Sequence, residues 1–278
     1  MSDEKCADGV QPDHNPLKQR CEPPPTLRSQ IGTLVQFSQP VPYAEAGALQ
    51  KQLQKERIAE KRGDVLLLLE HLPVYTLGRR THPTHWECGE EVLRRTGASI
   101  EAVDRGGSIT YHGPGQVVGY PILKLAQYCS GPKQYVRKLE EVLILTLARW
   151  GIEGYRIEKQ PGVWVQWNQS DAKIAAIGVR IDRGVTIHGF ALNVDLDLFP
   201  FRHIVPCGLA RCHITSMAEF RHSTLSSSIV AEQVAQDFAQ TFNIQWMNTP
   251  PTSGCGNTIL NFRPRRPRCP HDQRDTHA

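Results

Sequence analysis

At residues 105–116 the chain reads Arg105-Gly106-Gly107-Ser108-Ile109-Thr110-Tyr111-His112-Gly113-Pro114-Gly115-Gln116, with four glycines and one proline around an arginine, a tyrosine and a histidine. Glycine permits positive φ and lets the main chain approach a bound group closely, while Pro114 fixes its own φ and restrains Gly113. The stretch therefore predicts a backbone shaped around a ligand. A glycine-rich hairpin turn is the alternative that this stretch alone leaves open.

Two segments downstream favour the ligand hypothesis. Lys173 begins the apolar run Lys-Ile-Ala-Ala-Ile-Gly at 173–178, and Cys207 stands within Ile-Val-Pro-Cys-Gly-Leu at 204–209. A cysteine thiolate is a strong nucleophile toward thioesters, but an ordinary thiol with a pKa near ~8.5 is only slightly ionised at neutral pH. A lysine ammonium in an apolar strand would stabilise the thiolate. Together the three segments suggest an acyl-transfer site.

Each of these residues also has an ordinary structural interpretation. Lys173 closely follows the polar turn Asn-Gln-Ser-Asp at 168–171, so its ammonium could lie in water at a strand end. Cys207 could be a small buried hydrophobic residue, because its environment decides the reactivity of a cysteine. His112 and His188 could be hydrogen-bonded histidines of a core or loop instead of catalytic bases. The residues alone permit a cysteine acyltransferase without establishing it.

Length and composition indicate a globular protein. At 278 residues and 40% hydrophobic, the chain can bury a full core as one large domain or as a main domain with a small lobe. It contains no run of about 18 apolar residues, so no membrane span is expected. Residues 1–30 contain five acidic residues and no apolar core of a signal peptide. We expect a cytoplasmic protein with three parts: a disordered segment at 1–30, a catalytic domain at 31–248 and a disordered basic tail at 249–278.

Charge and cysteine content exclude other classes. The formal net charge is +4, and the segment 262–278 contributes +3 of it through five arginines and two aspartates. The remaining chain lacks a basic helix with interleaved aromatic residues, so we expect no nucleic-acid binding. The eight cysteines include no Cys-x-x-Cys pair, and Cys207, Cys212 and His213 lack a fourth ligand at suitable spacing. Neither a disulfide framework nor a metal site is expected.

Hydrophobic periodicity predicts three helices and five strands. Helices are expected at 42–62, where apolar residues stand among charged ones, at 132–150, where they recur at intervals of three and four, and at 229–242, where they align on one face. Strands are expected at 64–70, 117–123, 163–167, 173–181 and 185–194, the last three as an antiparallel meander, and a loop is expected at 73–80. This order lacks regular strand–helix alternation, and the glycine-rich stretch precedes a strand instead of opening a helix. The sequence favours an α+β fold over a Rossmann dinucleotide site.

Taken together, the motifs resemble those of the lipoyl(octanoyl) transferases. The similarity rests on Arg-Gly-Gly-x-x-Thr-Tyr-His-Gly-Pro-Gly-Gln at 105–116, Val-Gly-Tyr-Pro-Ile-Leu at 118–123, Lys-Ile-Ala-Ala-Ile-Gly at 173–178, His-Gly-Phe-Ala-Leu-Asn-Val at 188–194 and Pro-Cys-Gly-Leu at 206–209. It covers about residues 31–243 and includes neither terminal segment. The resemblance implies a single α+β domain, with a mostly antiparallel or mixed sheet and packed helices, similar to the catalytic domains of biotin and lipoate protein ligases.

The resemblance also implies roles for individual residues. Cys207 resembles the family's acyl-thioester nucleophile, and Lys173 resembles the lysine that lowers the pKa of that thiol and transfers protons. The acyl substrate is expected to contact three segments, made up of Arg105, Gly106, Gly107, Ser108, Ile109, Thr110, Tyr111, His112, Ala176, Ile177, Gly178, Gly189, Phe190 and Ala191.

The activity implied by the resemblance is transfer of an octanoyl or lipoyl group to a lysine of a lipoyl domain. The phosphopantetheine of acyl carrier protein would deliver the acyl group, and no cofactor, ATP or metal would be needed. The expected acceptors are lipoyl domains of 2-oxoacid dehydrogenase complexes and the glycine cleavage H protein, and a monomer is expected. Two alternatives stay open: an ATP-dependent lipoate or biotin protein ligase, which would activate a free acid as an adenylate, and a non-catalytic carrier-binding protein.

Overall fold

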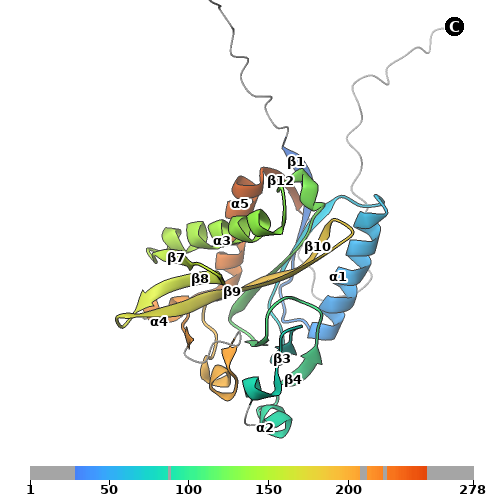
Figure 1. Cartoon of the computed structure of the whole chain (residues 1–278). Helices are drawn as coiled ribbons and strands as arrows, with labels where there is room; N and C mark the ends of the chain where they lie inside the picture. Colours follow the sequence, from blue (N-terminus) through green and yellow to red (C-terminus); the bar gives the residue numbers. More distant parts are fainter. Residues whose placement is uncertain (1–28, 87–88, 207–211, 222–223, 249–278) are drawn as a thin grey trace, which may run out of the picture.

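A mixed sheet of nine strands forms the centre of the computed structural model, which describes residues 29–86, 89–206, 212–221 and 224–248 (Figure 1). Eight of the strands follow the order β12 (Ile244–Asn248), β1 (Gln30–Gln36), β2 (Asp64–Leu69), β6 (Gln116–Ile122), β10 (Val185–Asn193), β9 (Ser170–Asp182), β8 (Gln160–Trp167) and β7 (Gly154–Ile157). The short strand β11 (His213–Ile214) pairs with β9 in parallel. β1 runs parallel to β2 and β12, and the other pairs along this order are antiparallel.

Helices cover both faces of this sheet, because its central strands are apolar on both sides. Figure 1 shows α1 (Tyr43–Ile58) on one face and α3 (Pro132–Arg149) with α5 (Ser227–Phe242) on the other. The side chains of β2 alternate between the two layers, as the period of a strand requires. Leu66 and Leu68 pack in the core under α3 and α5, whereas Val65, Leu67 and Leu69 pack in the core under α1.

An ion pair between a buried aspartate and a half-exposed arginine joins α3 to α5. Asp237 of α5 is fully buried, and its carboxylate accepts hydrogen bonds from the Thr146 hydroxyl at 2.9 Å and from Arg149 Nη2 at 2.7 Å. The rest of the contact is apolar, with Leu139, Leu143 and Leu147 of α3 completely buried at the four-residue spacing of one helix face. The apolar stripe that predicted α3 is therefore the surface that docks it.

A smaller sheet lies beside the main one and carries the glycine-rich stretch. Its strands follow the order β4 (Ser99–Ala102), β3 (Val74–Leu77) and β5 (Ile109–His112). The prediction of a loop at 73–80 is wrong, because β3 pairs with β4 on one side and with β5 on the other. The remaining short elements are α2 (Gly89–Arg95), α4 (Met217–Arg221) and 3₁₀ turns at Pro83–Trp86, Leu125–Gln127 and Phe199–His203.

The predicted α+β class is confirmed, with a mixed sheet and packed helices. The three predicted helices and the antiparallel meander of β8, β9 and β10 are present. The expected terminal segments lie outside the described residues, except that Ser29 and Gln30 are described and Gln30 is the first residue of β1. Within the described ranges, no helix is long and apolar enough to cross a membrane, and no group of three or more His, Cys, Asp or Glu side chains could hold a metal ion.

Candidate functional site

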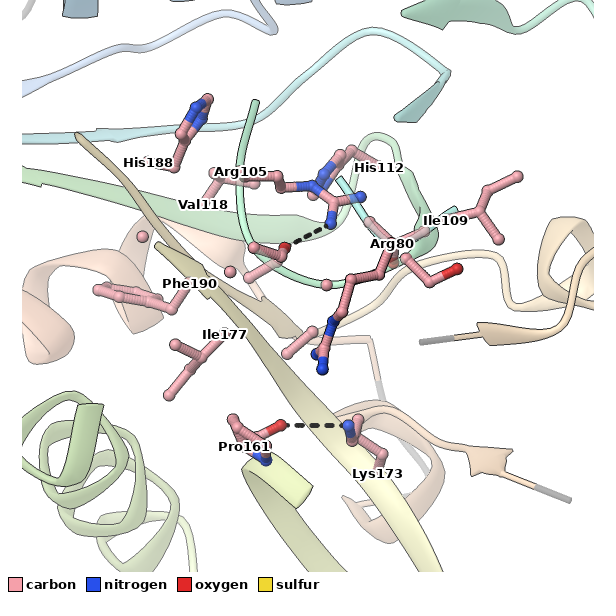
Figure 2. Close-up of a pocket in the computed structure, with 18 of the residues that line it drawn as sticks. Arg80, Arg105, Ile109, His112, Val118, Pro161, Lys173, Ile177, His188 and Phe190 are labelled. Atoms are coloured by element: carbon pink, nitrogen blue, oxygen red, sulfur yellow. Dashed lines mark hydrogen bonds between the residues drawn. The ribbon is translucent and has the colours of Figure 1, made fainter. Parts of the chain in front are cut away.

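A cavity of about 350 Å³ lies between the glycine-rich stretch and strands β9 and β10. Its volume falls within the range of about 300–1,000 Å³ that is typical of sites for small organic ligands. Figure 2 shows Lys173 and Pro161 at one end and His188, Arg105 and His112 at the other. Ile177 and Phe190 form part of the wall between the two ends.

Every residue expected to contact the acyl substrate lines this cavity except Tyr111. The ring of Tyr111 instead packs against Tyr75, with ring centroids 5.2 Å apart, and against Phe201, with centroids 5.8 Å apart. Sequence reasoning did not single out several other lining residues, namely Tyr43, Arg80, His85, Val118, Tyr120, Lys159, Gln160 and Pro161. Val118 and Tyr120 stand inside a motif that the family resemblance had already marked, so a signal for these two was available.

The glycines of the loop are required by its close contact with β9. The Gly106 amide donates a hydrogen bond to the Val179 carbonyl at 3.2 Å, which leaves no room for side chains between loop and strand. A Cβ on Gly178 would lie 2.9 Å from the Gly106 oxygen. Gly107 has a φ of 89°, a conformation that L side chains rarely adopt. The loop is thus a main-chain wall of the cavity, as its composition predicted.

Arg105 fixes the start of this wall to β3. Its side chain is buried, and Nη2 donates to the Thr76 hydroxyl at 2.7 Å and to the Thr76 carbonyl at 2.8 Å. Nη1 donates to the Gly106 carbonyl at 3.0 Å. Because these contacts hold Arg105 and its loop against β3, Arg105 helps to shape the cavity.

His112 has both ring nitrogens engaged. Gln116 Nε2 donates to Asn193 Oδ1 at 2.9 Å, so Gln116 Oε1 is the acceptor for His112 Nδ1–H at 2.7 Å. His112 Nε2 then accepts from the Thr76 hydroxyl at 3.4 Å. Burial, together with the nearby His71 and Arg105, holds the pKa of His112 well below its usual value. The geometry therefore favours a neutral, hydrogen-bonded histidine over a catalytic base.

His188 holds the other side of the loop. It is one of the non-glycine residues with positive φ, at 61°, and its Nε2 lies 2.7 Å from Asp104 Oδ1. Arg180 also pairs with the Asp104 carboxylate. Burial lowers the pKa of His188, although its hydrogen bond to the Asp104 carboxylate opposes this shift. A neutral His188 that donates to Asp104 thus anchors residue 104, next to Arg105, onto β9 and β10.

A cluster of aromatic and imidazole rings closes the end of the cavity away from Lys173. Tyr43 packs against His71, with ring centroids 4.9 Å apart and the ring planes tilted by 44°. His71 Nδ1 donates to the Val41 carbonyl at 2.9 Å, so Nε2 accepts from the Tyr120 hydroxyl at 2.7 Å. Burial lowers the pKa of His71 to about 4 and raises that of Tyr43 to about 12. These groups are therefore uncharged at neutral pH.

We expect this cluster to make the fold sensitive to acid. An exposed histidine in the unfolded chain has a pKa near ~6.5, so the unfolded state takes up a proton before folded His71 does, and stability falls as pH drops from that value toward 4. The contribution of His71 is about 2 kcal/mol between pH 7 and pH 5. Urea unfolding of the wild type and of His71→Gln measures it: the variant should lose about 2 kcal/mol less over that interval. An equal pH dependence of the two proteins would show that His71 titrates normally in the fold.

Lys173 is buried at the opposite end. Only 3% of the residue is exposed, so the interpretation of Lys173 as a strand-end lysine in water is wrong. Its Nζ donates to the Pro161 carbonyl at 3.2 Å and lies 4.6 Å from the centroid of the Trp164 ring. Lys173 lines the main cavity and also a small adjoining space of about 10 Å³.

Cys207 itself lies outside the described residues, but the described chain on either side of it borders Lys173. Pro206, the residue before Cys207, lines the small space together with Lys173. On the far side, Ile214 pairs with Lys173 in the β11–β9 ladder, and the Thr215 amide donates to the Lys173 carbonyl at 3.1 Å. The described residues on both sides of Cys207 thus lie next to Lys173, although they are far from it in the sequence.

The charged side chains that line the cavity are positive. Lys173, Arg80, Lys159 and Arg105 line it, and no aspartate or glutamate is found among the described residues that do so. In Figure 2 the Arg80 side chain points toward the Lys173 end, whereas Arg105 lies at the opposite end. The distance from Lys173 to Gly178 along β9 is about 17 Å. It exceeds the length of an extended octanoyl chain, which is roughly 9 Å at ~1.2 Å per bond.

Comparison with known proteins agrees with this chemistry. Residues 42–239 match the family model of the lipoyl protein ligase A/B catalytic domain. The chain is 46% identical to the octanoyltransferase of Solibacter usitatus over 207 residues, which cover 74% of this chain and 91% of that protein. It is 44% identical to the octanoyltransferase of Thermobifida fusca over 204 residues, 72% of this chain and 84% of that protein.

Solved structures share the fold at much lower identity. A bipartite lipoate protein ligase from Thermoplasma acidophilum superposes with a TM-score of 0.60 at 14% identity, covering 80% of this chain and 88% of that one. A lipoate-protein ligase A bound with ATP superposes with a TM-score of 0.58 at 15% identity, covering 80% of this chain and 90% of that one. These likenesses show a common fold.

Proposed function

The chain belongs to the octanoyltransferases of the lipoyl protein ligase A/B catalytic domain family, and we propose that its octanoyl group travels from acyl carrier protein to a lipoyl-domain lysine through a thioester on Cys207. The observation that carries this mechanism is the buried Lys173 ammonium at the end of an apolar-walled cavity. Pro206, one peptide bond from Cys207, lines the adjoining space with that lysine.

In the first half-reaction, the Cys207 sulfur attacks the thioester carbonyl of the octanoyl carrier. The C–S bond to the carrier's phosphopantetheine breaks, octanoyl-Cys207 forms, and the leaving thiolate takes up the proton that Cys207 has lost. A cation beside the sulfur favours the thiolate and the oxyanion of the tetrahedral intermediate. Lys173 supplies that cation and carries the proton between the two sulfurs.

In the second half-reaction, the amine of an acceptor lysine attacks octanoyl-Cys207. The acceptor ammonium first loses one proton to solvent and becomes a nucleophilic amine. The new C–N bond then forms as the C–S bond breaks, the Cys207 thiolate is regenerated, and the proton released from the new amide nitrogen passes to Lys173, which restores its ammonium. We propose lipoyl domains of 2-oxoacid dehydrogenase complexes and the glycine cleavage H protein as acceptors. We further propose that the enzyme acts as a monomer.

The acyl chain is assigned to the cavity wall. Ile177 and Phe190 are paired across β9 and β10, as are Gly178 and Gly189, so these residues form a continuous surface. The main chain of 105–108 covers it from the other side. An octanoyl chain that starts beside Lys173 would lie on this surface, shielded from water, with its methyl end toward Tyr43 and Tyr120.

The ligase alternative differs from this mechanism in its energy source. A ligase of the same fold activates a free acid with ATP, whereas a thioester already carries an activated acyl group. We therefore expect the purified protein to transfer the octanoyl group from an octanoyl carrier to a lipoyl domain without ATP or added metal, because acyl exchange from a thioester needs no second activation. The measurement is the mass of the lipoyl domain after incubation with and without ATP and a chelator. Modification only with free octanoate and ATP would establish a ligase, and no modification under either condition would favour a non-catalytic carrier-binding protein.

A further inference from the structure

A register shift in the β8–β9 ladder lies directly beside Lys173. Val163 pairs with Ala175, but the next residue of β8, Trp164, pairs with Lys173, so Ile174 of β9 is the extra residue. A bulge of this kind re-aims a neighbouring side chain. Without it Trp164 would face Ile174, and with it the indole lies opposite the lysine.

The geometry of β8 is adapted to this shift. Gly162 has a φ of 124°, and a Cβ there would lie 2.4 Å from the Ala175 oxygen, so only glycine fits. The Gly162 amide donates to the buried carboxylate of Glu140 in α3 at 3.2 Å. These constraints fix the position of the preceding Pro161 carbonyl, which accepts the hydrogen bond of Lys173 Nζ.

The indole of Trp164 is held just as firmly. Trp164 is 3% exposed, and its Nε1 donates to the Gln160 carbonyl at 3.1 Å. The Lys173 Nζ lies 4.6 Å from the ring centroid, within the distance at which the face of an aromatic ring attracts a cation. The tryptophan therefore presents its face, and no charged group, to the ammonium.

The neutral partners of Lys173 leave its positive charge uncompensated. An ammonium has three donors, and one of them makes a hydrogen bond to the Pro161 carbonyl. Within the described part of the chain, no carboxylate forms an ion pair with Lys173. A carboxylate partner would neutralise the lysine, whereas a carbonyl and an aromatic face leave its positive charge to act on an anion in the cavity.

We propose that Trp164 is a positioning residue for octanoyl transfer. Its ring and the Pro161 carbonyl hold the Lys173 ammonium in place without cancelling its charge, in the same small space that Pro206, the residue before Cys207, also lines. The thiolate and the oxyanion of the proposed mechanism would then be stabilised by a fixed and uncompensated cation. This inference rests on the proposed function, because it acts through Lys173 on Cys207. The bulge between β8 and β9 would thus position the catalytic side chain of Lys173.

The first test compares Trp164→Phe with Trp164→Leu in the full chain. Phenylalanine keeps an aromatic face and should retain kcat within about threefold, whereas leucine should lower kcat about tenfold or more, the range expected for a desolvated cation over a ring. The KM for the octanoyl carrier should not change, since Trp164 does not line the cavity. Alkylation of Cys207 by iodoacetamide at neutral pH should slow in the same order as kcat.

Trp167→Leu is the matched control. Trp167 stands on the same strand and packs against Phe220, with ring centroids 4.7 Å apart, away from the lysine. Its replacement should lower the melting temperature while leaving kcat and the alkylation rate near the wild-type values. Equal losses of kcat in Trp164→Phe and Trp164→Leu, or a loss in Trp167→Leu as large as in Trp164→Leu, would overturn the proposal.

Fluorinated tryptophan supplies a test that does not depend on the folding of the leucine variant. Fluorine weakens the negative face of the indole with little change of shape, so its incorporation into the wild type should lower kcat by a few fold. The same labelling in the Trp164→Phe background should have no effect, although the other four of the five tryptophans are still fluorinated. An equal effect in both backgrounds would contradict the proposal. Cys207→Ala serves as the control for the chemistry: if it still transfers, the thioester mechanism fails, and if it is inactive while the tryptophan series is flat, only the positioning role fails.

Discussion

Replacing Cys207 by alanine should lower octanoyl transfer by at least about 10⁴-fold, because removal of a covalent nucleophile eliminates the intermediate and leaves only binding and electrostatic effects. The measurement is the initial rate of octanoyl transfer to a lipoyl domain at saturating carrier. Cys212→Ala is the matched control, since Cys212 is a cysteine five positions further along the chain that the proposed mechanism does not use. It should transfer at the normal rate. Near-normal transfer by Cys207→Ala would refute the thioester mechanism.

Lys173→Arg should separate the charge of the lysine from its capacity to move protons. Arginine keeps a positive charge at position 173 but does not deprotonate, so it cannot accept and return the proton that both proposed half-reactions transfer. We expect Cys207 to remain reactive toward iodoacetamide while octanoyl transfer falls at least about 100-fold, the lower range for loss of a positioned acid or base. Steady-state transfer rates and alkylation rates on the same preparation measure the two properties.

The control for that substitution is Lys138→Arg. Lys138 has contacts of the same kind as Lys173, with its Nζ 5.1 Å from the centroid of the Phe242 ring and 3.0 Å from the Thr241 carbonyl, but it does not line the cavity. Its replacement should leave transfer unchanged. Near-normal transfer by Lys173→Arg would show that Lys173 serves only as a fixed charge and would assign proton transfer to solvent or another group. His112 is poorly placed for that role, because both of its nitrogens are engaged.

The elements that could be predicted from sequence are those whose own apolar pattern shows which of their residues are buried. α3 shows a repeating apolar stripe, and β2 shows an apolar run that both layers of helices bury. β3 and β5 are too short to show such a pattern. Each has four residues, and they are strands because they pair with each other and β3 also pairs with β4. No pattern within four residues indicates a partner found 20 or more positions away.

The candidate site shows the same division. The glycines of 105–107 predicted a main-chain wall because the requirement for a small residue is visible in the sequence itself. The burial of Lys173 was not visible, since it depends on the ring of Trp164 and the carbonyl of Pro161, on a different strand. Tyr111 was misplaced because its ring packs against Tyr75 and Phe201, on segments far from it in the sequence, whereas its strand neighbours Thr110 and His112 line the cavity.

The central claim is that the acyl group passes through Cys207 in the site beside Lys173, and loading of the enzyme in the absence of an acceptor tests it most directly. The full chain is incubated with octanoyl carrier alone, its intact mass is measured, and the modified peptide is sequenced. The proposed mechanism predicts a mass increase of one octanoyl group located on Cys207, which disappears when a lipoyl domain is added. An octanoyl group on any other residue, or transfer to the lipoyl domain by a protein that never acquires the group, would contradict it.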